Sequence, residues 1–76
     1  MTFDRAEFSV AFGRRLRAYR QLRRMSQMAL AARTGFTQPT ISNLERGEYF
    51  PAITTAFIVA EALEVHPKLL LFGEDE

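Results

Sequence analysis

Amide and hydroxyl side chains gather in one short stretch of the chain, between residues 37 and 43. These side chains both donate and accept hydrogen bonds: Thr37, Gln38, Thr40, Ser42 and Asn43. The amide of Gln38 carries the donor and the acceptor that match the major-groove edge of adenine. The stretch therefore indicates a surface that recognises a ligand by hydrogen bonding. The alternative is a solvated helix face on which some of these groups cap the helix.

The residue sets that enzymes and metal sites use are missing from the sequence. It has no cysteine and one histidine, His66, which precedes Pro67 and is expected to cap a helix. We find no paired carboxylates on an inward face, no glycine-rich phosphate loop and no nucleophile–base arrangement. We therefore expect a protein that is not an enzyme, with no catalytic residue, cofactor or metal ion.

Charge divides the chain into two halves. Residues 1–47 contain nine arginines against three acids, a net charge of +6, and residues 48–76 contain one lysine against six acids, a net charge of −5. Arginine suits bidentate contacts with phosphate and guanine. A basic half of this kind favours a polyanionic partner. The alternative is a solvated basic helix.

Apolar residues at helical spacing predict that helices form most of the chain, because the strict alternation typical of strands is almost absent. The first helix is expected over residues 5–24, and its apolar face contains Phe8, Phe12, Leu16, Tyr19 and Leu22. Later helices are expected over residues 53–64 and from His66 to Phe72. Further core positions are expected at Met25, Phe36, Phe57 and Leu63.

The length allows one domain at most, so we expect a single all-α domain over residues 1–76, with a frayed tail over 73–76. No apolar run approaches the ~18 residues of a membrane span. We therefore expect no membrane partner and a cytoplasmic location.

Two short helices within residues 26–46 are separated only by Gly35-Phe36-Thr37. Gly35 fits the left-handed residue that ends many helices. The hydroxyls of Ser26 and Thr37 can cap the two helix N-termini, and Pro39 is tolerated in a first turn. Two short helices joined by such a turn match the description of a helix-turn-helix, although other helical hairpins share this pattern.

The run MSQMALAARTGFTQPTISNLERG, residues 25–47, resembles the helix-turn-helix of the phage-repressor and Cro-like (XRE) family. The matching residues occur at the family's spacing: Ser26-Gln27, Leu30-Ala31, Gly35-Phe36, Ile41-Ser42 and Glu45-Arg46-Gly47. Matches outside the run extend the resemblance over residues 10–73. The resemblance implies a compact five-helix, lambda-repressor-like domain in which the segment from Thr37 to Arg46 lies in the major groove of DNA.

The resemblance also implies roles for individual residues. DNA base contacts are expected from Thr37, Gln38, Pro39, Thr40, Ser42 and Asn43. Pro39 departs from the family, which often has a polar residue there, and it leaves only an apolar contact such as one with a thymine methyl. Phosphate contacts are expected from Gln27 and Arg46. Arg14, Arg15 and Arg17 on the first helix are candidates for further phosphate contacts, and the alternative for each is a solvated helix surface. Gln27 should also brace Gln38, and Arg20 and Glu45 match an ion pair that links the first helix to the third.

Ile58 and Leu69 stand where the family usually has polar residues, which suggests a homodimer interface in the C-terminal half. The alternative is that they extend a small core. The sequence therefore predicts a transcriptional regulator, either a repressor or a controller-type activator, that binds an inverted repeat in double-stranded DNA as a homodimer. The alternative function is an antitoxin-like module that binds a partner protein, such as a toxin, through its C-terminal half.

Overall fold

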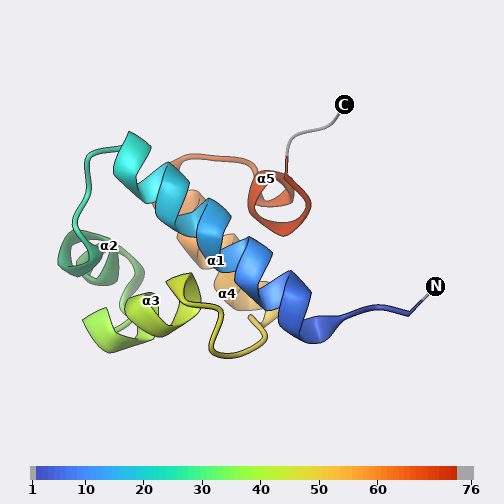
Figure 1. The fold of residues 1–76 in the computed structure, drawn as a ribbon. Helices are drawn as coiled ribbons and strands as arrows, with labels where there is room; N and C mark the ends of the chain where they lie inside the picture. Colours follow the sequence, from blue (N-terminus) through green and yellow to red (C-terminus); the bar gives the residue numbers. More distant parts are fainter. Residues whose placement is uncertain (1, 74–76) are drawn as a thin grey trace.

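Five helices and their connecting turns account for residues 2–73, the part of the chain that the computed structural model describes (Figure 1). The helices are α1 (Arg5–Leu22), α2 (Gln27–Thr34), α3 (Gln38–Glu45), α4 (Ile53–Leu63) and α5 (Pro67–Leu71). No strand occurs in this range, which confirms the expected all-α class. Of the tail expected to fray, residues 74–76 lie outside the described residues. None of the helices in residues 2–73 combines the length and apolar character needed to cross a membrane.

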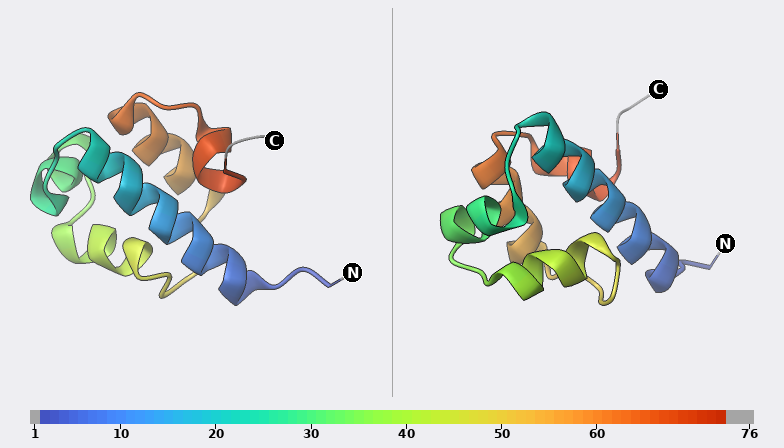
Figure 2. Two further views of the ribbon diagram at one scale, coloured as in Figure 1. Left: turned by 45° about the horizontal axis from the view of Figure 1, so that its top comes forward. Right: turned by 60° about the vertical axis from the view of Figure 1, so that its left-hand side comes forward.

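Helix α1 lies between α3 and α5, while α2 and α4 pack directly against each other (Figure 2). On one side α3 packs against α1 and α2, and on the other α5 packs against α1 and α4. The contact between α1 and α3 is close because of Gly13. A Cβ atom at this position would lie 2.3 Å from the carbonyl oxygen of Leu44 and 2.5 Å from that of Glu45. The absence of a side chain thus fixes how near α3 can approach α1.

Short-range hydrogen bonds begin three of the helices where the sequence predicts. The Ser26 hydroxyl accepts from the N–H of Ala29 at 3.0 Å, and the Thr37 hydroxyl accepts from the N–H of Thr40 at 3.3 Å. His66 Nδ1 accepts from the N–H of Lys68 at 3.1 Å, which confirms its capping role. These bonds satisfy N–H groups that have no partner within the helix.

Large apolar side chains from all five helices form one core. Its eight largest fully buried members are each less than 2% exposed: Phe12, Leu16, Leu30, Ile41, Leu44, Leu63, Leu70 and Val59. Met25 and Phe36 are half-buried and pack against this core, in line with the sequence prediction.

Two core predictions are wrong. Leu22 is 68% exposed. It follows Leu16 by two steps of three residues, and together these steps place it roughly 120° around the helix from the buried stripe of α1. The stripe ends on Arg20 instead. Phe57 is 54% exposed, since α4 turns its smaller residues Ala56 and Ala60 toward the core. Helix α1 also ends two residues earlier than predicted, where Arg24 adopts a left-handed conformation with φ 60°.

Candidate nucleic-acid interface

Helices α2 and α3 form the helix-turn-helix, and α3 presents its N-terminal end on the surface (Figure 1). Gly35 closes α2 in the left-handed conformation, with φ 81°, and Thr37 opens α3. Ile41 and Leu44 are 0% and 1% exposed and anchor α3 to the core. The apolar face of α3 therefore fixes which of its polar residues face outward.

The polar residues of α3 fall into two groups by exposure. Thr37, Gln38 and Pro39 are exposed, and they stand together at the N-terminal end of the helix. Thr40, Ser42 and Asn43 are half-buried. Of the six residues that the sequence predicts to contact bases, the first three are therefore the most accessible.

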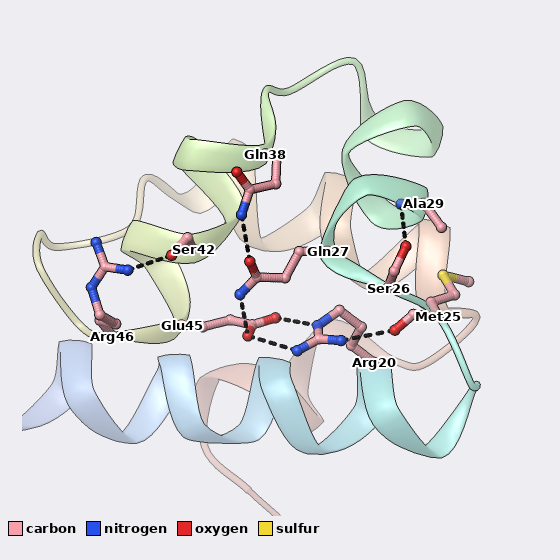
Figure 3. A network of polar contacts seen from close by, with 9 residues as sticks. All are labelled: Arg20, Met25, Ser26, Gln27, Ala29, Gln38, Ser42, Glu45 and Arg46. Atoms are coloured by element: carbon pink, nitrogen blue, oxygen red, sulfur yellow. Dashed lines mark hydrogen bonds and ion pairs between the residues drawn. The ribbon is translucent and has the colours of Figure 1, made fainter.

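Arg20 and Glu45 form the ion pair that the resemblance implies (Figure 3). Arg20 Nε donates to Glu45 Oε2 at 2.5 Å, and Nη2 donates to Oε1 at 3.0 Å. Arg20 Nη1 donates to the carbonyl of Met25 at 2.8 Å. The hydrogen bond to Glu45 raises the pKa of the Arg20 guanidinium above its ordinary value, although burial acts against this. The side chains are 10% and 3% exposed, so the pair joins α1, α3 and the segment before α2 within the protein.

The ion pair continues outward as a line of side-chain amides (Figure 3). Gln27 Nε2 donates to Glu45 Oε1 at 3.0 Å, and Gln38 Nε2 donates to Gln27 Oε1 at 2.6 Å. The brace between Gln27 and Gln38 is thus present. The line leads from a buried carboxylate to an exposed amide at the tip of α3.

The side chains of Ser42 and Asn43 accept hydrogen bonds from Arg46, the residue at the C-terminal cap of α3. The Arg46 guanidinium donates to Ser42 Oγ and to Asn43 Oδ1, and it pairs with Glu48 at 3.2 Å. Arg46 itself is exposed. The two polar side chains therefore hold a cation at the surface of α3.

Thr40 also has an internal role. Its hydroxyl accepts from the Thr37 hydroxyl at 3.0 Å, and its carbonyl accepts from the Tyr49 hydroxyl at 3.4 Å. The capping role that the sequence left as an alternative is thus present for Thr37, whose hydroxyl accepts from the Thr40 N–H, and Thr37 is still exposed.

The arginines of α1 divide into exposed and structural ones. Arg14 and Arg17, both predicted to contact phosphate, are exposed. Arg15 Nη1 instead donates to the carbonyls of Leu70 and Leu71 at the end of α5, at 3.3 and 3.2 Å. Arg23 binds the end of α4 in the same way, because its Nε donates to the carbonyl of Leu63 at 2.8 Å. Part of the arginine excess thus satisfies carbonyls at helix C-termini, a role that the charge pattern of the sequence does not predict.

Ile58 and Leu69 lie in two different surface hollows. Ile58 is 39% exposed and belongs to the α4 hollow, which is lined by Ile53, Thr54, Phe57 and Ile58. Leu69 lines a separate groove between α1 and α5, together with Leu22 and Phe72. The structure thus does not bring the two predicted interface residues together in one hollow.

Comparison with known proteins agrees with this architecture. The profile of the helix-turn-helix (HTH_3) family matches residues 16–70. An HTH-type transcriptional regulator of Sinorhizobium fredii is 43% identical over 60 residues. These cover 74% of this chain and 31% of that protein, so the chain spans about a third of this relative's length.

Solved structures of similar fold include two regulators. The restriction-modification controller protein C.AhdI from Aeromonas hydrophila superposes with a TM-score of 0.84 at 31% identity, over 90% of this chain and 99% of that one. The P22 c2 repressor, solved in complex with a synthetic operator, superposes with a TM-score of 0.77 at 33% identity, over 83% and 96% of the two chains. The five-helix arrangement, the capped α2–α3 pair and the profile match together show that this chain belongs to the helix-turn-helix family of DNA-binding transcriptional regulators, the family of the phage repressors and Cro-like proteins.

Proposed function

We propose that this protein regulates transcription in the cytoplasm by binding an inverted repeat in double-stranded DNA as a homodimer. The observation that supports this most directly is the exposed N-terminal end of α3, braced by Gln27 and anchored by buried residues behind it. Side chains at this end of a recognition helix reach base edges in the major groove. Two copies would place their α3 helices in successive major grooves about 34 Å apart.

Within this proposal, Gln38 reads an adenine and Pro39 contacts a thymine methyl, with Thr37 beside them. The side chains of Thr40, Ser42 and Asn43 already form hydrogen bonds within the protein. A contact with a base would either add to these hydrogen bonds or replace them. We assign the larger share of base reading to the three exposed residues.

The backbone contacts of the proposal come from the basic half of the chain. Arg46 is exposed at the end of α3, and Arg14 and Arg17 are exposed on α1. Gln27 stands at the N-terminus of α2, where the helix dipole favours a phosphate. Because these contacts release counterions, the affinity for DNA should fall steeply as the salt concentration rises.

The first test is binding selection on random DNA duplexes at two salt concentrations, with Gln38→Ala as the variant. We expect Gln38→Ala to lose its preference at one base pair of each half-site, by about tenfold, since one bidentate contact is lost. The matched control is Gln21→Ala, which removes an exposed glutamine of α1 and should leave the preference unchanged. An unchanged preference in Gln38→Ala would show that α3 does not read DNA through this residue.

A second candidate function is an antitoxin-like module that binds a partner protein through its C-terminal half. The α4 hollow supports it, because three large apolar side chains lie exposed there: Ile53, Phe57 and Ile58. The same hollow supports the homodimer, and the oligomeric state of the purified chain distinguishes the two.

A further inference from the structure

We infer that Glu45 is a positioning residue that determines which hydrogen-bonding groups of the Gln38 amide remain for a base, with Gln27 as the intermediate. This inference rests on the proposed function, because it concerns how α3 distinguishes one base from another. It arises from the direction of the hydrogen bonds in the line Arg20, Glu45, Gln27 and Gln38 (Figure 3).

The direction of the line begins at the ion pair. The carboxylate of Glu45 has no hydrogen to donate, and it already accepts two hydrogen bonds from Arg20. Its side chain is 3% exposed, so water has little access to exchange with these partners. Any group that approaches Glu45 Oε1 from α2 must therefore be a donor.

This requirement orients the two amides in turn. Gln27 meets Glu45 with Nε2, at 3.0 Å, which points its Oε1 toward α3. Gln38 must then meet Gln27 with a donor, and its Nε2 does so at 2.6 Å. A reversed amide at either position would place two acceptors or two donors against each other. The acceptor-only carboxylate of Glu45 thus fixes the orientation of both amides, including the exposed amide of Gln38.

The consequence is a fixed pattern of groups at the tip of α3. One hydrogen of Gln38 Nε2 is used by Gln27, which leaves Oε1 and the second hydrogen for DNA. Adenine offers a donor at N6 and an acceptor at N7, and it matches this pair. Guanine offers two acceptors, O6 and N7, and it would leave Gln38 Oε1 facing an acceptor. The line therefore favours adenine over guanine.

The test compares two variants that both disturb the ion pair. Glu45→Gln replaces the acceptor-only group with an amide that can present either end, so the direction of the line is lost. Arg20→Lys keeps the carboxylate, and hence the direction, but loses the bidentate geometry. Arg20→Lys is thus a matched control for loss of stability. Thermal unfolding monitored by circular dichroism confirms that each variant is folded at the temperature used.

The first readout needs no DNA. Side-chain NH₂ signals of Gln27 and Gln38 are followed by ¹⁵N NMR in the free protein. We expect the two pairs of signals to be similar in wild type and Arg20→Lys, and to move in Glu45→Gln. Unmoved Gln38 signals in Glu45→Gln would overturn the inference, whether or not the protein binds DNA.

The second readout is the ratio of affinities for duplexes with adenine or guanine at the position that Gln38→Ala identifies. We expect this ratio to fall about tenfold in Glu45→Gln and to stay within twofold of wild type in Arg20→Lys. An equal fall in both variants would mean that Glu45 acts only through stability, and no fall in either would also refute the inference. If the wild type shows no base preference, the proposed function fails instead, and the NMR comparison still decides the direction of the line.

Discussion

At the scale of single residues, the ion pair of Arg20 and Glu45 should show the largest effect of one substitution. Arg20→Met leaves a carboxylate that is 3% exposed without its cation, and we expect a loss of about 3–5 kcal/mol in the free energy of unfolding. The double variant Arg20→Met/Glu45→Leu removes both charges at similar volume, so it should recover most of this loss. The stability that comes from the hydrogen bond between Arg20 and the Met25 carbonyl should not return, because Arg20→Met and the double variant both lack this bond.

Urea unfolding of the wild type, the two single variants and the double variant forms a double-mutant cycle that measures the coupling. Additive losses, with the double variant least stable of all, would mean that the two side chains are not coupled, and this result would contradict the prediction. Recovery in the double variant would mean that the loss in each single variant comes from the unpaired buried charge.

Residue-level features were predictable where their cause is local in the sequence. The caps Ser26, Thr37 and His66 bind N–H groups two or three residues ahead, so the sequence around each one suffices to predict it. Arg15 and Arg23 bind carbonyls that lie 55 and 40 residues away along the sequence. No local sequence pattern predicts such a partner. The exposure of Phe57 was missed for the same reason, since burial depends on which face of α4 the other helices cover.

At the scale of elements, the close approach of α1 to α3 depends on Gly13. It can be tested by whether Gly13→Ala raises or lowers the free energy of unfolding. Alanine is the better helix former by about 1 kcal/mol, so Gly13→Ala would stabilise an isolated helix. In this fold the added Cβ would meet the carbonyl oxygens of Leu44 and Glu45 at 2.3 and 2.5 Å. These are backbone atoms, which cannot give way without moving α3. We therefore expect a net loss of about 1–3 kcal/mol, the usual cost of overpacking.

Thermal unfolding measures this loss, and Arg17→Ala is the control, since it adds no atoms at an exposed position of the same helix. The control should change the stability by less than about 0.5 kcal/mol. Backbone amide shifts of Leu44 and Glu45 should move in Gly13→Ala and not in the control. A more stable Gly13→Ala variant would contradict the close packing of the two helices.

The ends of the elements show the same limit of sequence reasoning. The bounds of α2 and α3 were predicted within a residue, because a capping hydroxyl and a glycine mark them locally. The end of α1 was placed two residues late, since nothing in the sequence near Arg23 marks it as the capping residue. There Nε and Nη2 of Arg23 bind the carbonyls of Leu63 and Glu64, at the far end of α4.

At the scale of the whole molecule, α1 lies between α3, which we propose to bind DNA, and α5, which belongs to the half proposed to bind a protein (Figure 2). A dimer contact on the C-terminal half would leave the tip of α3 accessible in both copies. Two hollows could supply it, the α4 hollow and the α1–α5 groove. The sequence predicted an interface at Ile58 and Leu69 without distinguishing the two, because exposure at separate hollows becomes evident only in three dimensions.

The α4 hollow is the surface we expect to hold the dimer together, because its large side chains are all apolar, whereas the α1–α5 groove also contains Arg15. Phe57→Gln should shift the purified protein from dimer to monomer at tens of micromolar in equilibrium sedimentation. It should also weaken binding to an inverted repeat while leaving binding to a single half-site unchanged. Leu22→Gln is the matched variant, since Leu22 is likewise an exposed apolar residue but lines the other groove. If Leu22→Gln dissociates the dimer and Phe57→Gln does not, the interface lies at the groove beside Leu69. A wild type that remains monomeric with and without DNA would rule out the homodimer and favour a different protein as the partner of the α4 hollow.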